Sequence, residues 1–470
     1  MNVGGGQRPA GRRVLVVGFG TAGVGIAQDA SEHGDLIVGF LDDVKQDPRV
    51  LGRLADVNRV VTEHEVEAVY FAIPTIGAAE LREFVAGLEQ TGLTLSMLPR
   101  TYATISSERV TVDDLTDVDV LHLVGRSPVK HDLLDARKTV EGRRALVTGA
   151  AGSIGSRLVE HLLHLGAEEV VAFDWWETGL FHLANRLDDS RLSLAVGDVK
   201  NTSRLRRVFE AQRPELVFHG AAYKHVPLME QNPAEAIANN VLGAENVLRQ
   251  AIATGASHAV YVSTDKAVRP ANVMGATKRL GELLLSDLAR ESGSTTLTAV
   301  RFGNVLQSNG SVMETFRRQI AAGGPVTVTH PEVTRFFMTI DEAAHLIIQS
   351  AILGANGDIC VLDMGDPVRI MDLAKSLVRI TDPTIEITVT GLRPGEKLYE
   401  ELTYQSELAA STRNSKIFIL RVEDEMTVPA SDIRRVLERA RSGNLTDAEA
   451  EAALLRMGFA LQPQSRRAGL

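Results

Sequence analysis

Two stretches of this chain show an apolar strand pattern that runs directly into a glycine-rich turn and then into a helical pattern. The first stretch begins at Arg13 and the second at Arg144. The glycines of the two turns are Gly18, Gly20 and Gly23 in the first stretch and Gly149, Gly152 and Gly155 in the second. Such glycines let backbone amides approach a phosphate at a helix N-terminus, and they also allow close packing of helix on strand. Two such beginnings about 130 residues apart in a chain of 470 residues predict two tandem Rossmann-like α/β domains.

Residues 13–100 are predicted to form the first domain, because strand and helix patterns alternate through them. Its further strands are expected at 36–41, 68–73 and 93–98, with a helix at 78–90. Asp42 follows the second strand, where an acid suits a ribose hydroxyl. The same glycines also serve tight packing, so the sequence leaves open whether this domain binds a ligand or has a structural or regulatory role.

The segments that flank the two domains have weaker patterns. Residues 1–12 are predicted to be flexible, and residues 101–141 to connect the domains, because the periodicity fades there and short acidic segments alternate. Residues 423–470 are predicted to form two amphipathic helices, a C-terminal appendage for packing or oligomerisation.

Residues 142–422 are predicted to form an NAD-binding domain, with its substrate-binding part mainly after residue 305. The turn from Gly149 to Gly155, which includes Ser153 and Ile154, is expected to hold a pyrophosphate. The strand at 169–173 ends in Asp174, and a carboxylate there favours NAD, because it would repel the 2′-phosphate of NADP.

Further cofactor contacts are expected where the next two strands end. Asp198 and Val199 follow the strand at 192–196, where Asp198 either reaches the adenine amino group or only forms a turn. Ala221 and Ala222 follow the strand at 216–219, and their small side chains let the backbone approach the cofactor.

The strand at 258–262 leads into Ser263-Thr-Asp-Lys, and its carboxyl end is where open α/β sheets place their chemistry. Asp265 and Lys266 set an acid beside an amine, and Lys278 follows on the next helix. An adjacent acid and base that act on neighbouring carbons of one substrate are what an elimination needs. For such a tetrapeptide alone, a polar strand end and a solvated helix lysine would be the more common interpretation, and the other motifs of the chain argue against it.

Polar residues at the same edge are candidate substrate ligands. They are Lys224, His225, Asn304, Arg335, Arg393 and Glu396. An arginine fork matches a diphosphate bidentately, a glutamate can hold a ribose diol, and Asn304 suits a phosphate or a sugar. A lone histidine is also commonly structural, so both interpretations of His225 stand.

The composition is that of a globular protein, with 44% hydrophobic and 23% charged residues. A formal net charge of −10 argues against nucleic-acid binding. Cys360 is the only cysteine and lies in an apolar strand pattern, so we expect a small buried hydrophobe in a reducing cytoplasm. No signal peptide, metal site, membrane insertion or run of 18 apolar residues is expected.

The motifs together resemble a known family. Residues 138–420 resemble the extended short-chain dehydrogenase/reductases that act as UDP-N-acetylglucosamine 4,6-dehydratases in bacterial polysaccharide and glycan synthesis. The matching segments are Thr148-Gly-Ala-Ala-Gly-Ser-Ile-Gly-Ser, Ala221-Ala-Tyr-Lys-His-Val-Pro-Leu-Met-Glu, Ser263-Thr-Asp-Lys-Ala-Val, Asn272-Val-Met-Gly-Ala-Thr-Lys-Arg, Arg301-Phe-Gly-Asn-Val-Leu, Thr334-Arg-Phe-Phe-Met-Thr and Arg393-Pro-Gly-Glu-Lys. Residues 13–135 resemble the Rossmann-like domain that precedes the catalytic domain in the long branch of that family.

Met274 indicates which branch of this family the chain resembles. In short-chain dehydrogenases the helix carries Tyr-x-x-x-Lys, and here Met274 takes the tyrosine position before Lys278. The short, carbon-5-inverting branch keeps the tyrosine, whereas the long, configuration-retaining branch has methionine. Long-branch members usually carry transmembrane helices ahead of the first domain, so their absence here indicates a soluble member or a shortened chain.

The resemblance implies a redox-neutral dehydration of UDP-N-acetylglucosamine to UDP-2-acetamido-2,6-dideoxy-4-hexulose with tightly held NAD. Lys266 would take the carbon 5 proton, Asp265 would protonate the departing carbon 6 hydroxyl, and Lys278 would hold the nicotinamide ribose. The group that deprotonates the carbon 4 hydroxyl is open between Asp265 and Thr264 acting as a relay. Because a base must be neutral, we expect the pKa of Lys266 to be lowered by desolvation or by Lys278.

Two other functions fit parts of the pattern. A nucleotide-sugar 4-epimerase also begins by oxidising carbon 4, but it does not need an Asp-Lys pair. A non-catalytic NAD-sensing protein of two Rossmann domains is compatible with the missing tyrosine. In each case a homo-oligomer is expected.

Overall fold

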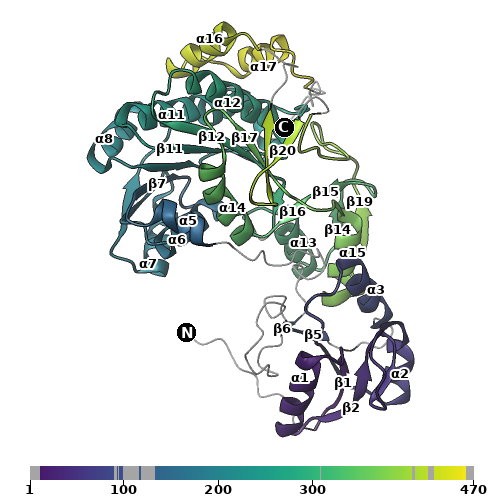
Figure 1. Ribbon diagram of the computed structural model, residues 1–470. Coiled ribbons are helices and arrows are strands. Elements are labelled where there is room, and N and C mark those ends of the chain that lie inside the picture. Colours follow the sequence, from purple (N-terminus) through teal and green to yellow (C-terminus); the bar gives the residue numbers. More distant parts are fainter. Residues whose placement is uncertain are drawn as a thin grey trace. The chain divides into compact units, whose positions relative to one another are not determined.

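The computed structural model describes residues 11–88, 93, 95–98, 116–117, 133–306, 308–404, 408–421 and 428–461. The chain divides into two compact units (Figure 1). The first comprises Met1–Lys130 with Asp372–Ile385, and the second comprises His131–Met371 with Glu386–Leu470. The predicted flexible residues 1–10 and most of the predicted connecting segment lie outside the described residues.

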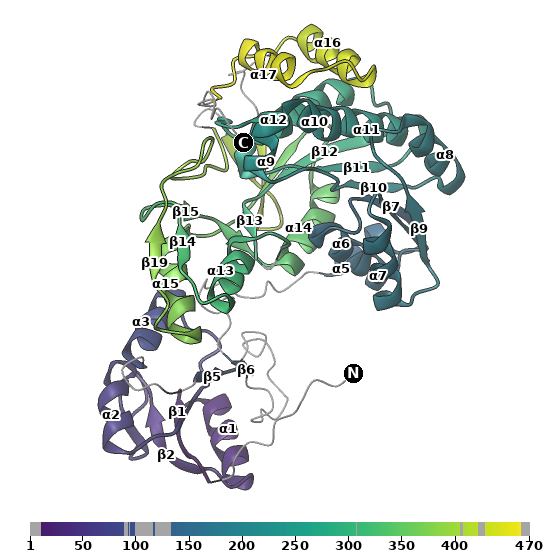
Figure 2. The same ribbon diagram turned by 180° about the vertical axis from the view of Figure 1, so that it is seen from behind.

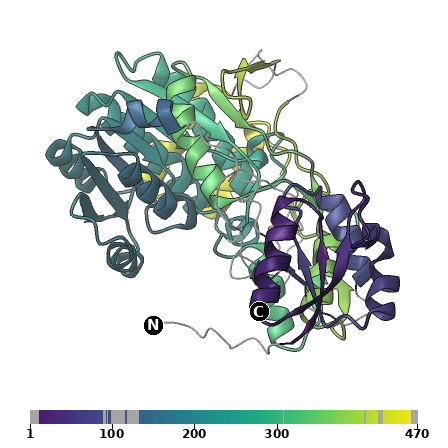
Figure 3. The ribbon, with the colours of Figure 1, turned by 60° about the horizontal axis from the view of Figure 1, so that its bottom comes forward.

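The first unit is built on a six-stranded sheet with the strand order β3-β2-β1-β4-β5-β6. The strands are β1 (Arg13–Val17), β2 (Leu36–Leu41), β3 (Val50–Gly52), β4 (Ala68–Phe71), β5 (Leu95–Met97) and β6 (Thr116–Asp117), of which only β6 is antiparallel to its neighbour. The helices are α1 (Thr21–Glu32), α2 (Val57–Glu63), α3 (Ala78–Leu88) and the short η1 (Leu54–Asp56). Helix α1 packs on one face of the sheet and α2 and α3 pack on the other (Figure 3).

The second unit contains a nine-stranded sheet with the order β20-β21-β17-β12-β11-β10-β7-β8-β9. Its strands are β7 (Arg144–Thr148), β8 (Glu169–Asp174), β9 (Leu192–Val196), β10 (Leu216–His219), β11 (His258–Val262), β12 (Thr296–Arg301), β17 (Ile359–Leu362), β20 (Leu408–Ser411) and β21 (Ile417–Arg421). Seven of them are parallel, and β20 and β21 continue the sheet in antiparallel pairing. The parallel strands are short apolar runs because helices bury both of their faces.

Two hydrophobic cores lie on opposite faces of this sheet, each beneath a group of helices, and Figure 2 shows these helices. One face carries α8 (Thr202–Gln212), α11 (Gly243–Thr254) and α12 (Val273–Ala289). The other carries α5 (Leu133–Val140), α6 (Ser153–His164), α7 (Glu177–Leu187) and α14 (Ile340–Leu353). The predicted fold class, α/β with Rossmann-like topology, is therefore confirmed.

Short elements after residue 303 build a smaller region beside the sheet. Three two-stranded pairs are β13 (Asn304–Val305) with β16 (Phe337–Met338), β14 (Val326–Val328) with β19 (Ile387–Val389), and β15 (Thr334–Arg335) with β18 (Val368–Arg369). Helices α13 (Val312–Ala321) and α15 (Ile370–Thr381) belong to the same stretch of sequence, although most of α15 groups with the first unit.

Helix α5 lies within residues 101–141, where the sequence analysis expects a connecting segment. Ala136 and Val140 are fully buried in the core of the second unit. Eight residues are too few for a helical period to stand out in sequence, so tertiary packing makes this helix. None of the helices in the described ranges combines the length and the apolar composition that crossing a bilayer requires.

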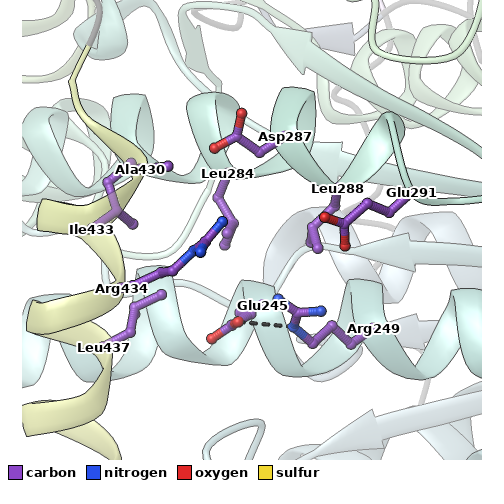
Figure 4. Close-up of a pocket in the computed structure, with 10 residues that line it drawn as sticks. All are labelled: Glu245, Arg249, Leu284, Asp287, Leu288, Glu291, Ala430, Ile433, Arg434 and Leu437. Atoms are coloured by element: carbon purple, nitrogen blue, oxygen red, sulfur yellow. Dashed lines mark hydrogen bonds and ion pairs between the residues drawn. The ribbon is translucent and has the colours of Figure 1, made fainter.

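The C-terminal helices α16 (Ala430–Arg441) and α17 (Asp447–Arg456) pack on the same core as α11 and α12. Ile433 and Leu437 of α16 are buried there, beside the crevice in Figure 4. Glu245 on α11 accepts hydrogen bonds from Arg249 Nε at 2.8 Å and from Arg441 Nη2 at 2.7 Å. Of the two roles expected for this appendage, the structure shows the packing role.

Cys360 lies in β17 and is fully buried, as predicted. Burial and the charge of Asp358 raise the pKa of its thiol to about 12. The thiol is therefore protonated and unreactive at neutral pH.

Candidate functional site

Many of the predicted site residues of the second unit lie at or just after the carboxyl ends of its parallel strands. Strand β7 pairs with β8 on one side and with β10 on the other, so the strand order reverses direction there. Crevices at such a switch point are where open α/β sheets bind their ligands.

The glycine turn after β7 has a shape that only glycine allows. Gly149 has φ +72°, and a Cβ on it would lie 2.6 Å from the backbone nitrogen of Ala221. A Cβ on Gly155 would lie 2.0 Å from the carbonyl oxygen of Gly149. Gly152 caps the N-terminus of α6, which begins at Ser153. The turn therefore brings a helix N-terminus to the sheet edge, the arrangement that binds phosphate groups.

Other residues of the turn hold it in place. Ile154 packs on the hydrophobic core between α6 and the sheet. Ser153 Oγ accepts a hydrogen bond from the backbone N–H of Asn309 at 3.0 Å, which joins the turn to the loop after β13.

Asp174 ends β8 as expected and is buried. Its Oδ2 accepts a hydrogen bond from the N–H of Ala151 at 3.0 Å, and its Oδ1 accepts one from Trp176 at 2.9 Å. The carboxylate thus braces the glycine turn. Because each carboxylate oxygen has two lone pairs, it retains capacity for a ribose hydroxyl.

Asp198 and Val199 take different positions after β9. Asp198 Oδ1 accepts a hydrogen bond from the N–H of Lys200 at 2.8 Å, which is the turn geometry of the simpler interpretation. Val199 is 4% exposed and packs in the core against Gly243. Its side chain supports the fold beneath the sheet edge.

The segment after β10 is held by the buried side chain of Asn240. Asn240 Oδ1 accepts a hydrogen bond from the N–H of Tyr223 at 2.8 Å. Its Nδ2 donates to Tyr223 O and to Thr277 Oγ1, both at 3.0 Å. This clamp fixes the backbone next to Ala222 and Lys224 at the sheet edge.

Lys224 and His225 are both exposed. His225 precedes the first residue of α9 (Val226–Gln231), and its ring lies so near Gly310 that a Cβ there would be 2.5 Å from Cε1. In the described part of the chain, no hydrogen bond or ion pair joins either side chain to Asp265 or Lys266.

The loop after β11 brings Thr264, Asp265 and Lys266 into direct contact. Lys266 Nζ donates to Asp265 Oδ1 at 3.1 Å, and Thr264 Oγ1 donates to the same oxygen at 2.8 Å. Asp265 is completely buried, and its Oδ2 has no hydrogen-bond partner among the described residues. A hydroxyl, a carboxylate and an amine therefore form one connected set at the carboxyl end of a central strand.

Groups from three other segments extend this set. Lys266 Nζ donates to Asn304 Oδ1 at 3.3 Å and lies 3.5 Å from Glu400 Oε1. Glu400 Oε1 is also 3.9 Å from Arg335 Nε, and Arg335 Nη2 donates to Glu396 Oε1 at 3.4 Å. Glu400 is not predicted from the sequence, because the run Tyr399-Glu-Glu resembles a solvated charged segment.

The remaining arginine of the predicted set is placed differently. The backbone N–H of Arg393 donates to Glu396 Oε2 at 3.1 Å, while its side chain is exposed. Within the described residues, no hydrogen bond or ion pair connects the Arg393 guanidinium to the network around Lys266.

The pKa of Lys266 moves in the direction opposite to the expected one. Burial acts to lower it, but the charges of Asp265 and Glu400 outweigh burial and raise the pKa above its ordinary value. The prediction of a lowered pKa is therefore wrong for the free protein, because the two carboxylates outweigh burial and the positive charge of Arg335.

Lys278 is instead the lysine with a lowered pKa. Burial lowers the pKa of Lys278 to about 7, and its Nζ lies 4.2 Å from the centre of the Tyr261 ring. The amine makes no hydrogen bond within the described chain. Met274, one turn earlier on α12, is 4% exposed and packs in the core. A buried amine in need of a partner, together with the glycine turn, fits a dinucleotide with a ribose diol.

A buried ionic cluster lies directly behind the loop after β11. Glu282 on α12 accepts hydrogen bonds from Ser263 Oγ at 2.6 Å, from Arg301 at 2.7 and 2.8 Å, and from Arg279 at 3.1 Å. Burial acts to raise the pKa of Glu282, but the two arginines hold it at about 2. Because Ser263 precedes Thr264, this cluster anchors the chain that carries the candidate catalytic residues.

A family described as polysaccharide biosynthesis protein matches residues 145–422. The capsular polysaccharide biosynthesis protein CapD of Staphylococcus aureus is 38% identical over 426 residues, which cover 87% of this chain and 71% of CapD. A UDP-glucose 4-epimerase of Rickettsia conorii is 38% identical over 271 residues, 56% of this chain and 78% of that one. The X-ray structure of Pen from Bacillus thuringiensis superposes with a TM-score of 0.56 at 32% identity, covering 60% of this chain and 90% of Pen.

Proposed function

The chain belongs to the polysaccharide biosynthesis protein family, and on that premise we propose that it is an NAD-dependent 4,6-dehydratase of UDP-N-acetylglucosamine. Its product would be UDP-2-acetamido-2,6-dideoxy-4-hexulose, for surface polysaccharide or glycan synthesis. The observation that carries the proposal is the contact between a buried carboxylate and an amine, Asp265 and Lys266, at the ligand-binding edge of the sheet.

The glycine turn, Asp174 and Lys278 are the residues that would hold the cofactor. Bound NAD would supply the transfer of a hydride from carbon 4 to carbon 6 of the hexose. Lys278 would donate hydrogen bonds to the nicotinamide ribose, which would satisfy an amine that lacks a hydrogen-bond partner in the described chain.

Asp265 would handle the proton that becomes part of the released water. Thr264 Oγ1 donates to Asp265 Oδ1, so a proton from the carbon 4 hydroxyl has a path to the carboxylate through Thr264. The Asp265 carboxyl would then give that proton to the carbon 6 hydroxyl as it departs. The O–H bond broken at carbon 4 is thus matched by the one formed in water, and no outside acid is required.

Lys266 would exchange the proton of carbon 5. This proton becomes acidic once carbon 4 is a ketone, and the neutral amine would take it and later return it to the same carbon. Protonation of Asp265 removes one of the two negative charges that raise the pKa of Lys266. Proton transfer to Asp265 therefore favours the neutral form of Lys266 at the step that requires it.

Because the chain is similar to a UDP-glucose 4-epimerase of Rickettsia conorii, 4-epimerisation is the rival activity. An epimerase inverts carbon 4 and leaves the carbon 6 hydroxyl in place, so it has no task for the acid and base at positions 265 and 266. The residue at the usual tyrosine position, Met274, is also buried and cannot titrate. These two observations favour the dehydratase.

The test is incubation of the protein with UDP-N-acetylglucosamine and mass spectrometry of the product. Loss of one water, with ultraviolet absorbance of the 4-keto sugar in alkali, is expected, and NMR of the product gives the configuration at carbon 5. Asp265→Asn and Lys266→Ala should each abolish turnover. The matched controls Asp287→Asn and Lys138→Ala change exposed side chains and should leave it intact.

Turnover that survives both site substitutions would contradict the assignment. A product of unchanged mass and inverted carbon 4 would establish the epimerase. Retention of NAD without turnover of any nucleotide sugar would favour the sensor.

A further inference from the structure

Glu400 is a buried carboxylate that the proposed mechanism does not yet use. Its side chain is 3% exposed. Its Oε1 lies 3.5 Å from Lys266 Nζ and 3.9 Å from Arg335 Nε, and its Oε2 has no hydrogen-bond partner among the described residues. A carboxylate buried in this way is costly unless charged neighbours compensate for the lost hydration.

The charged groups around the Lys266 amine come from several segments. Asp265 is its neighbour in sequence, Arg335 comes from β15, and Lys397 and Glu400 come from the segment after β19. Lys397 Nζ donates to the carbonyl oxygen of Val268 at 2.9 Å, so another acceptor engages this cation. Two carboxylates therefore face the amine of Lys266, and only one of them, Asp265, has a task in the reaction.

We propose that Glu400 is a positioning residue, which holds the Lys266 amine and the Arg335 guanidinium around the hexose and sets the pH at which Lys266 becomes a base. This inference rests on the proposed function, because it assigns Lys266 the exchange of the carbon 5 proton. Glu400 itself does not touch the reacting atoms in this scheme, and it acts through Lys266 and Arg335.

The expected direction follows from electrostatics. An opposite charge within about 4–6 Å moves a pKa by about 1–3 pH units toward the charged form. The carboxylate of Glu400 favours the ammonium form of Lys266 and thereby raises the pH needed to free the amine. Removal of that charge should shift the acidic limb of the pH profile to lower pH.

The decisive variant is Glu400→Gln, which keeps the shape of the side chain and removes its charge. The acidic limb of the kcat/KM profile for UDP-N-acetylglucosamine should move down by about 1 pH unit or more. Its plateau should fall about tenfold because Lys266 and Arg335 lose their common partner. Glu401→Gln is the matched control, because Glu401 is the adjacent residue and pairs with Arg269 on the exposed side.

A direct titration separates this proposal from the proposed function. In protein labelled with carbon-13 at lysine Cε, the Lys266 signal is assigned by its loss in Lys266→Arg, and its pKa is measured without substrate. The pKa should be lower in Glu400→Gln than in the parent and unchanged in Glu401→Gln. Absence of turnover in the parent protein would defeat the dehydratase, while this titration would still decide whether Glu400 controls Lys266.

An unchanged limb and an unchanged Lys266 pKa in Glu400→Gln would overturn the proposal, even if activity fell. If circular dichroism shows that Glu400→Gln does not fold, Glu400→Asp takes its place. The shorter side chain moves the carboxylate away from Lys266, so the limb should move in the same direction by a smaller amount. No movement in the aspartate variant would likewise overturn the proposal.

Discussion

Replacement of Glu282 by glutamine should destabilise the second unit strongly, although it changes only one oxygen to an amide. Glu282 is fully buried and receives hydrogen bonds from two buried arginines, Arg279 and Arg301, and from Ser263. Glutamine would leave both guanidinium groups without their counter-charge inside the protein, and it would turn an amide group toward a donor.

The expected loss of unfolding free energy can be obtained from the pKa shift of Glu282 and from the usual cost of breaking a buried ion pair, and the two values agree. The difference between an ordinary glutamate pKa of 4.5 and about 2 corresponds to about 3 kcal/mol of stabilisation at neutral pH. Breaking a buried ion pair from one side costs about 3–5 kcal/mol. We therefore expect Glu282→Gln to lower the free energy of unfolding by about 3–5 kcal/mol.

The pH dependence has a definite sign. Because the pKa of Glu282 is lower in the folded than in the unfolded chain, its stabilisation is complete above about pH 4.5 and disappears as the pH falls toward 2. The parent protein should lose this contribution over that range. Glu282→Gln should lack it, so the two unfolding free energies should converge at low pH.

Urea unfolding followed by tryptophan fluorescence measures the stability of the second unit, which contains Glu282. The only tryptophans, Trp175 and Trp176, lie in the second unit, so the signal does not report the first one. Glu291→Gln, which changes an exposed glutamate, is the matched control and should alter the unfolding free energy by less than about 0.5 kcal/mol. A loss below about 1 kcal/mol in Glu282→Gln, with an unchanged dependence on urea, would refute the reasoning.

Two further substitutions test the site. Lys278→Met should stabilise the protein at pH 6, because the difference between a lysine pKa of 10.5 and about 7 corresponds to about 5 kcal/mol that burial of the charge costs there. Urea unfolding should show this gain shrinking between pH 7 and 10.5 as the folded lysine becomes neutral, and a gain independent of pH would contradict the cause. Arg335→Lys should raise KM for the nucleotide sugar about tenfold with little change in kcat, because a lysine loses the bidentate fork. Steady-state kinetics that show a fall in kcat with constant KM would instead assign Arg335 to the chemical step.

The elements predicted well are those with long, regular patterns. The strands β9, β10 and β11 have the expected bounds, because buried parallel strands are unbroken apolar runs between turn residues. Helix α5 could not be predicted from the sequence, because its few apolar residues become core residues only when the helix packs against α14. The first unit also begins with a strand, a glycine turn and a helix, although its glycines have a different spacing, and whether it binds a ligand stays open.

The candidate site also contains residues that the sequence predicts and a residue that only the structure reveals. Thr264, Asp265 and Lys266 are neighbours in sequence, so their proximity could be predicted from one strand end. Glu400 lies more than 100 residues after Lys266 in the sequence, and no local pattern predicts the contact between them.

The linear sequence by itself determined the strand ends at which the candidate catalytic residues lie and the glycines that shape the turn after β7, because those properties depend on local backbone geometry and on runs of apolar residues. Only the tertiary structure decided the charge state of each lysine. That state depends on burial and on which carboxylates lie within a few ångströms, so Asp265 and Glu400 raise the pKa of Lys266 whereas burial lowers the pKa of Lys278 to about 7.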